Sequence, residues 1–290
     1  MRVFDLHCDT VTECLKKGEP LRTHTGHVSL ERGGAFEAWA QVFAVYVPDS
    51  LDGRQAAEYC DLAVGYYHAQ LPDIRRGCRP ILAVENGKAL GGSVDRLETL
   101  AAKGVEITTL TWNGENELGY GAGCDHREGL KLLGKRVVRR MFELGMLPDV
   151  SHLNHEGFWN VAAMSDWAGR PLLATHSNCG AVQEHPRSLS DSQLREVFKS
   201  GGLVGLCLHK KFLGGEGTAE DFARHLSHVA ALGGEKCVAL GSDYDGCKVH
   251  PSLAGIETLA FLDEELDRLG FARQLREDLF WGNAARFFAA

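Results

Sequence analysis

Eight short apolar stretches recur along the chain, and polar residues close most of them. Each stretch is only a few residues long and rich in Val, Leu and Ile, which is typical of strands buried on both faces of a parallel sheet. The stretches span residues 3–6, 40–47, 80–84, 105–111, 146–150, 171–174, 203–208 and 238–240. They predict eight parallel strands.

Helical patterns lie between these stretches. Apolar residues recur at steps of three and four through 130–144 before Gly145, and again through 222–229, while Ser190 and Gln193 have the spacing of a capping box. Strand and helix therefore alternate about eight times, which favours an α/β fold with a single (β/α)8 TIM barrel. We expect residues 1–290 to form one domain.

One segment shows little helical period. Residues 10–38 carry Gly18, Pro20, Gly26 and two further glycines, and they follow the first predicted strand. We expect this segment to be an elaborated loop over the mouth of the barrel.

Composition narrows the functional classes. The formal net charge is −8, which argues against nucleic acid or an anionic membrane surface as a partner. Nine cysteines occur without any C-x-x-C spacing, as expected of reduced thiols in the cytoplasm. Neither a signal-peptide pattern nor a run of about 18 apolar residues is visible. We expect a cytoplasmic enzyme with a small-molecule substrate, and we keep a homodimer as a candidate assembly.

Metal-ligand residue types stand at the ends of four predicted strands. His7 and Asp9 follow the first, Glu85 the third, His152 the fifth and His176 the sixth. The active sites of TIM barrels form at these carboxyl ends, so the five side chains are expected to converge, with the first two on one face of an extended strand. Imidazoles and carboxylates without clustered cysteines suit catalytic Zn²⁺, and a carboxylate can bridge two ions about 3.5–4 Å apart. The set predicts a binuclear hydrolytic site.

The same strand ends carry a resemblance to a known family. The chain resembles the membrane (renal) dipeptidase family of zinc peptidases over nearly its whole length, ending at Gly282-Asn283 and Arg286-Phe287-Phe288. The motifs that carry the resemblance are Asp5-Leu6-His7-Cys8-Asp9, Val84-Glu85-Asn86-Gly87, Asp149-Val150-Ser151-His152, Thr175-His176-Ser177, His185-Pro186-Arg187-Ser188-Leu189-Ser190-Asp191 and Gly241-Ser242-Asp243-Tyr244-Asp245-Gly246.

The resemblance implies a TIM barrel of the metal-dependent hydrolase type and a specific chemistry. Two zinc ions would be held by His7 and Asp9 on one side and by His152 and His176 on the other, with Glu85 bridging them. Asp243 matches the catalytic acid/base, and Arg187 matches the arginine that holds the free carboxylate of a dipeptide. A metal-bridging hydroxide would attack the peptide bond of a dipeptide, often one with a D-residue at the C-terminal position.

The chain also departs from the family. Better-known members carry a histidine at the end of the fourth strand that stabilises the tetrahedral intermediate, whereas this chain has Trp112 there. Trp112 is a candidate wall of the substrate pocket, and His209, after the seventh stretch, is a candidate substrate contact. Asp245 is the rival of Asp243 for the acid/base role.

Two other functions remain open at this point. One is a different metal-dependent amidohydrolase on the same barrel, acting on a lactone, cyclic amide or β-lactam. The other is an inactive barrel that serves as a binding module.

Overall fold

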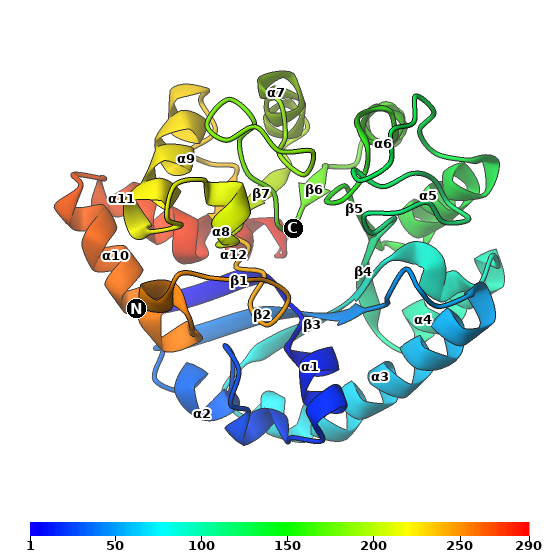
Figure 1. Ribbon diagram of the computed structural model, residues 1–290, viewed down its shortest axis with the longest axis horizontal. Helices are drawn as coiled ribbons and strands as arrows, with labels where there is room; N and C mark the ends of the chain where they lie inside the picture. The colour runs from blue at the N-terminus through cyan, green and yellow to red at the C-terminus, as the bar shows by residue number, and fades with distance from the viewer. Residues whose placement is uncertain (290) are drawn as a thin grey trace.

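Eight parallel strands close into a barrel in the computed structural model, which describes residues 1–289 (Figure 1). The strands pair in chain order, and the last returns to pair with the first. They are β1 (Arg2–Cys8), β2 (Ala38–Tyr46), β3 (Arg79–Glu85), β4 (Val105–Thr109), β5 (Leu147–Asp149), β6 (Leu173–Ala174), β7 (Leu203–Leu206) and β8 (Val238–Leu240). Every strand overlaps a predicted apolar stretch, so the predicted TIM barrel is confirmed.

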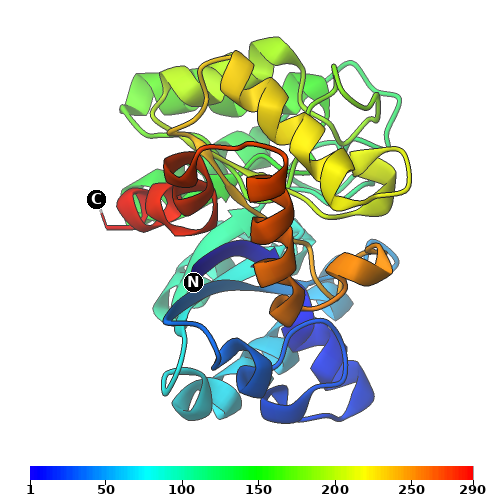
Figure 2. The ribbon, with the colours of Figure 1, turned by 90° about the vertical axis from the view of Figure 1, so that its left-hand side faces the viewer.

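Helices surround the strands, as the two perpendicular ribbon views show (Figures 1 and 2). The α-helices are α1 (Thr10–Lys17), α2 (Leu30–Gly33), α3 (Gly53–Ile74), α4 (Val94–Ala102), α5 (Leu132–Leu144), α6 (His155–Ala168), α7 (Asp191–Lys199), α8 (Lys210–Leu213), α9 (Ala219–Ala231), α10 (Leu259–Arg268), α11 (Arg273–Glu277) and α12 (Asn283–Phe287). Short turns of other helix types are η1 (Leu21–Thr23), η2 (Gly87–Leu90), η3 (Pro251–Leu253), η4 (Ile256–Thr258) and the π-helical η5 (Asp278–Gly282).

Strand alternation divides the core into two layers. Ala40, Val42 and Ala44 of β2 belong to the cluster inside the barrel, whereas Phe43 and Val45 pack in the larger cluster beneath the helices. The inner cluster extends to η5 and α12, so these elements close the end of the barrel opposite the carboxyl ends of the strands. The mouth formed by those carboxyl ends is not covered by these elements.

An irregularity in β1 decides which of its residues faces that mouth. Phe4 and Leu6 point into the barrel, so strict alternation would place Cys8 inside next. The pairing of β1 with β2 shifts register between Asp5 and Cys8, and Cys8 packs in the outer cluster instead. Such a shift re-aims side chains, and it leaves His7 at the mouth.

The segment after β1 differs from the expected loop. Its first eight residues form α1, which buries Val11 and Cys14 and ends at Gly18 in the left-handed conformation (φ 65°). A helix of two turns is too short to show a clear period in the sequence, which is why the loop prediction was wrong here. Residues 18–38 carry only the short η1 and α2.

The predicted helix ends are confirmed more closely. α5 ends directly before Gly145, whose φ of 73° permits the left-handed cap. α7 begins at the capping box in which Ser190 and Gln193 each accept a hydrogen bond from the other's backbone. Within residues 1–289, no helix combines the length and the apolar composition that crossing a membrane requires.

Candidate active site

The five predicted metal-ligand side chains converge at the carboxyl ends of the strands. One donor atom each of His7, Asp9 and Glu85 lie within 4.8 Å of one another, and so do donor atoms of Glu85, His152 and His176. All five residues are buried. Glu85 therefore belongs to two sets of possible metal donors, one on each side of it.

The two carboxylate oxygens of Glu85 face different partners. Oε2 lies 3.5 Å from His7 Nε2, while Oε1 lies 2.9 Å from His152 Nε2 and 3.6 Å from His176 Nε2. Glu85 ends β3 on the same face as Ile81 and Ala83, which point into the barrel. This is the arrangement that a carboxylate needs in order to bridge two cations.

Asp9 reaches the site by a different route from the one expected. β1 ends at Cys8, and Asp9 occupies the N-cap position of α1, where its side chain makes no capping hydrogen bond. Its Oδ1 lies 3.8 Å from His7 Nε2. The carboxylate is thus held at the mouth by the start of a helix rather than by strand alternation.

Several buried polar atoms here lack hydrogen-bond partners. His7 Nε2 and Asp9 Oδ1 are both buried and unpaired among the described residues. Burying an unpaired polar atom is costly, so such atoms commonly mark a ligand or ion site. Imidazole nitrogens and carboxylate oxygens are the donors that Zn²⁺ binds, so the residues present fit a pair of zinc ions.

Hydrogen bonds fix which imidazole nitrogens are free. His152 Nδ1 lies 3.0 Å from the side-chain amide oxygen Oδ1 of Asn113, which can only accept, so Nδ1 carries the proton. His176 Nδ1 lies 2.8 Å from Thr175 Oγ1, whose own proton is donated to Asp149 Oδ2 at 2.6 Å. Both Nε2 atoms are consequently unprotonated and only 2.8 Å apart. Their lone pairs repel one another at this distance, and a cation bound between them would remove the repulsion.

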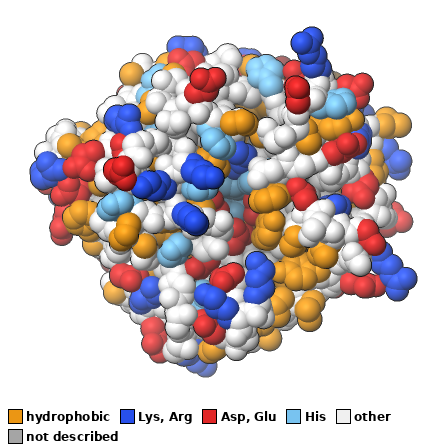
Figure 3. Space-filling model, in the orientation of Figure 1, with side chains coloured by type: hydrophobic (Ala, Val, Ile, Leu, Met, Phe, Trp, Pro, Cys, Tyr) orange, Lys and Arg blue, Asp and Glu red, His pale blue; other side chains and the backbone are white. Residues whose placement is uncertain are grey.

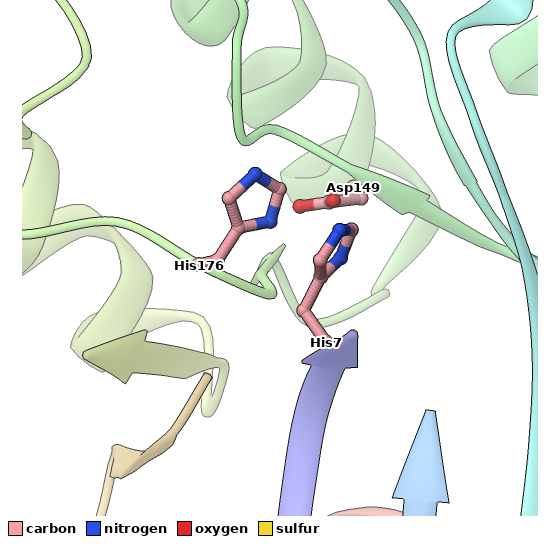
Figure 4. A group of neighbouring side chains, drawn as sticks. All are labelled: His7, Asp149 and His176. Atoms are coloured by element: carbon pink, nitrogen blue, oxygen red, sulfur yellow. The ribbon is translucent and has the colours of Figure 1, made fainter. Parts of the chain in front are cut away.

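Asp149 lies beside His7 and His176, as Figure 4 shows. Its carboxylate is already hydrogen-bonded: Oδ1 accepts from the backbone N–H groups of Ser151 and Thr175, and Oδ2 accepts from the hydroxyls of Thr109 and Thr175. Asp149 is therefore suited to orienting the imidazoles rather than to binding a metal itself.

Electrostatics set the protonation states of the cluster. Burial lowers the pKa of His7, but the Glu85 and Asp9 carboxylates outweigh it and raise that pKa to about 10. Burial, assisted by the Arg187 charge, lowers the pKa of His152 to about 4. Burial and the Glu85 charge raise the pKa of Asp9 well above its usual value. A cluster with such opposed shifts is typical of a functional site.

A cavity of about 220 Å³ opens beside this cluster. Trp112 and His209 line it, together with Tyr46 and Phe212. Trp112 stacks on the His152 ring at 6.0 Å and meets the Tyr46 ring edge-on at 5.3 Å, so its indole forms a wall. His209 accepts a hydrogen bond from the backbone of Lys211 at the start of α8. Figure 3 shows histidine side chains near the centre of the face seen in Figure 1, with Lys and Arg beside them.

The structure separates the two candidate acids. Asp243 is 8% exposed and lines the cavity, and burial raises its pKa to about 7. Asp245 also borders the cavity, but its carboxylate is occupied by the hydroxyl of Thr10 and the backbone N–H of His27, each at 2.5 Å. Asp245 therefore anchors the segment after α1, and Asp243 has the freer carboxylate.

Arg187 supplies a buried positive charge, and no carboxylate among residues 1–289 forms a salt bridge with it. Its Nη2 donates to the backbone oxygen of His176 at 3.2 Å, and its guanidinium lies 5.5 Å from the centre of the Phe212 ring. Its Nε is buried and unpaired among the described residues. A buried guanidinium with an unpaired N–H group is suited to binding an anionic group of a ligand.

Sequence reasoning missed the residues that orient the predicted ligands. Asn113 and Thr175 directly adjoin Trp112 and His176, so their positions at strand ends were a usable signal. Gly246 is a further omission: a β-carbon there would overlap Asp9 Oδ2 and lie 2.6 Å from Asp243 Oδ1.

Comparison with known proteins gives consistent matches. The sequence profile described as membrane dipeptidase (peptidase family M19) matches residues 61–290. An uncharacterized Klebsiella pneumoniae protein, named for its position in the pqqA 5′ region, is 33% identical over 215 residues, covering 70% of this chain and 78% of the relative.

Two solved structures resemble the whole chain. The dipeptidase AC, a metallopeptidase, is 28% identical with a TM-score of 0.89, covering 99% of this chain and 97% of its own. The second is a Rhodobacter sphaeroides metallopeptidase bound to a phosphinate mimic of the dipeptide L-Ala-D-Ala. It is 27% identical with a TM-score of 0.90, and the match covers 100% of this chain and 99% of that structure's chain.

Proposed function

The chain belongs to the membrane dipeptidase family, peptidase family M19, and is a metal-dependent hydrolase; on that premise we propose that it is a binuclear zinc dipeptidase. The observation that carries the proposal is the position of Glu85, whose two oxygens face two separate sets of donors. A single catalytic ion would not need the second set.

Each zinc ion has its own residues in this proposal. His7, Asp9 and Glu85 would hold one ion, and His152, His176 and Glu85 would hold the other. When bound, the two ions polarise the scissile carbonyl and lower the pKa of water, so that hydroxide is available as the nucleophile near neutral pH.

Asp243 moves the proton in this mechanism. Its carboxylate lines the cavity close to Asp9, and a pKa of about 7 is suited to accepting and releasing a proton near neutral pH. In this mechanism Asp243 accepts the proton of the attacking water and delivers it to the leaving amine. Asp243→Asn should keep the bound metal and lose turnover.

Arg187 positions the substrate. Its guanidinium, whose Nε has no hydrogen-bond partner among the described residues, would bind the C-terminal carboxylate of a dipeptide, because a planar fork pairs well with a carboxylate. Arg187 also lies on the side of His152 and His176, so the carboxylate is anchored next to the second set of donors. The bound mimic of L-Ala-D-Ala in the Rhodobacter sphaeroides relative supports acceptance of a D-residue at this position.

Trp112 marks the point where specificity could differ. It fills the cavity wall between Tyr46 and His152, and it cannot donate a charged hydrogen bond to an oxyanion. This feature keeps open a second candidate function, namely hydrolysis of a lactone, cyclic amide or β-lactam on the same metal site.

A substrate panel separates these functions. The zinc-loaded enzyme is offered L-L and L-D dipeptides beside tripeptides, N-acetylated dipeptides, lactones, cyclic amides and β-lactams. The proposal expects cleavage of the free dipeptides and no cleavage of the tripeptides or blocked dipeptides. Preference for a lactone or lactam over every dipeptide would favour the second function, and a protein that binds no zinc and cleaves nothing would revive a binding module.

We also propose a reducing compartment, the cytoplasm, and keep a homodimer as the candidate assembly. All nine cysteines are free thiols, which supports the first point. A fractionation of the native cells and a sedimentation measurement test the two proposals.

A further inference from the structure

Two thiols lie next to the Asp243 carboxylate and have no part in the mechanism above. Cys207 follows β7 and Cys247 follows β8, so the pairing of β7 with β8 brings them together. One atom each of Cys207, Asp243 and Cys247 lie within 4.8 Å of one another. Cys207 Sγ is 3.7 Å from Asp243 Oδ2.

The spacing suits a tetrahedral cation. Zinc binds sulfur at about 2.3 Å and carboxylate oxygen at about 2.1 Å, so a tetrahedral ion holds these two atoms about 3.6 Å apart. The observed 3.7 Å between Cys207 Sγ and Asp243 Oδ2 needs little adjustment. Two sulfurs and one oxygen form a soft donor set, unlike the histidines and carboxylates around Glu85.

Burial and the nearby Asp243 carboxylate raise the pKa of both thiols, so each thiol gives up its proton only when a cation binds. The backbone N–H of His209 donates to Cys207 Sγ at 3.3 Å, and the Arg187 charge partly offsets the rise in the pKa of this thiol. Asp243 itself is more than nine-tenths buried, and its side chain points at the two thiols. Cys247 is half-buried, and Gly246 beside it lines the cavity, so an ion can enter from the mouth.

We propose that Cys207, Cys247 and Asp243 form a third cation site, which takes a soft divalent ion such as Cd²⁺ or excess Zn²⁺ and thereby inhibits the enzyme. Binding forms two metal–sulfur bonds and one metal–oxygen bond, and each thiol releases its proton to solvent. Inhibition follows because the Asp243 carboxylate is then no longer free to exchange protons. That consequence rests on the proposed function, whereas binding of the ion does not.

The test uses the full-length, zinc-loaded enzyme, kept reduced with a phosphine and titrated with cadmium. Thiolate–cadmium coordination gives a charge-transfer band in the ultraviolet, and the Glu85 cluster contributes none because it contains no thiol. We expect one additional cadmium per chain, appearance of the band, and a fall in dipeptide hydrolysis of at least about 100-fold, the scale of lost acid–base catalysis.

Variants assign the band to these residues. Cys207→Ser and Cys247→Ser should each lose the band and the inhibition, measured against each variant's own rate without cadmium. Cys237→Ser is the matched control, because this half-buried thiol lies before β8 at the opposite end of the barrel, and it should keep both. A measurement on the unmodified chain needs no variant: cadmium should protect Cys247 from alkylation by iodoacetamide, as read by peptide mass spectrometry.

The outcomes are distinguishable. No band in the unmodified enzyme, a band that persists in both serine variants, or alkylation of Cys247 that ignores cadmium would each overturn the site. A band with an unchanged hydrolysis rate would overturn the inhibition and the role of Asp243. A band that depends on both thiols in a protein that cleaves no dipeptide would overturn the proposed function and leave the cation site standing.

Discussion

Thr175 Oγ1 donates a hydrogen bond to Asp149 Oδ2 at 2.6 Å, and through it one carboxylate orients two imidazoles. The same hydroxyl oxygen lies 2.8 Å from His176 Nδ1 and 3.3 Å from His7 Nδ1. Because its proton is used by Asp149, the hydroxyl can only accept from the rings, so that each imidazole in its neutral form has its Nε2 atom free for metal. The two predicted metal sites are therefore connected twice, through the shared ligand Glu85 and through the Thr175 hydroxyl, which contacts a histidine of each site.

This relationship predicts that Thr175→Val weakens metal binding without removing a ligand. The loss of an outer hydrogen bond to a ligating histidine commonly costs about 10–100-fold in affinity, so we expect a change of that size. Competition with a chromophoric chelator measures it. Thr99→Val, at a surface position of α4, is the control, and equal affinities in the two variants would contradict the assignment.

Arg187→Lys should impair substrate binding more than turnover. Lysine keeps the charge but loses the planar fork, and a hydrogen bond to a charged group is worth about 1.5–3 kcal/mol. KM for dipeptides should rise about 10–100-fold, the same energy expressed as a ratio, and discrimination against dipeptide amides should weaken. Arg140→Lys, which changes a surface arginine paired with Glu98, should leave both quantities unaltered. An unchanged KM in Arg187→Lys would remove this residue from the substrate site.

Gly246→Ala should damage the site through a single methyl group. The added β-carbon would overlap Asp9 Oδ2 and lie 2.6 Å from Asp243 Oδ1, so one or both carboxylates must move. A displacement of about 1 Å can cost about 100-fold in rate, and we expect kcat/KM to fall by that order. Gly65→Ala is the control: open space surrounds this exposed position of α3, and alanine should raise stability by up to about 1 kcal/mol without affecting the kinetics. Normal activity in Gly246→Ala would show that the two carboxylates are not held as described.

His225 should make the fold sensitive to mild acid. Its Nδ1 accepts from the backbone of Cys179 and its Nε2 donates to Leu213, each at 3.2 Å, and burial lowers its pKa from 6.5 to about 4. Between these values the unfolded chain binds a proton that the folded chain does not, so stability decreases as pH falls from about 6.5 toward 4.

The matched test replaces this ring with an amide that cannot titrate. His225→Gln should lose less unfolding free energy than the unmodified protein between about pH 6.5 and 5, by about 1.5 kcal/mol. Urea unfolding of the two proteins measures the difference, with the exposed His68→Gln as control. Parallel pH profiles for all three proteins would refute the role of His225.

Local sequence pattern predicted the barrel and the strand ends but not the geometry at the mouth. Each strand could be identified from its own apolar residues, and Glu85 follows the alternation of β3 into the barrel. The register shift in β1 and the capping position of Asp9 have no such local signature. The register shift arises from the pairing of β1 with β2, and the position of Asp9 arises from the start of α1. The alternation of side chains along a strand predicts neither.

Contacts between distant segments were also beyond local pattern. Cys207 and Cys247 are separated in the sequence by two helices, α8 and α9, and the strand β8, and the pairing of β7 with β8 places both beside Asp243. Asn113 was visible at the end of the fourth strand, but its hydrogen bond to His152 depends on the path of the loop after β5. Residue type at a strand end thus indicates membership of the site, whereas the role of the residue follows from packing.

Titration of metal-free protein with zinc, followed by the rate of hydrolysis of L-Ala-D-Ala, tests the central claim most directly. The claim of a binuclear site bridged by Glu85 predicts that activity rises until two zinc ions per chain are bound, and that Glu85→Gln weakens both binding steps. Full activity with a single ion, or hydrolysis by protein that holds no metal, would contradict it.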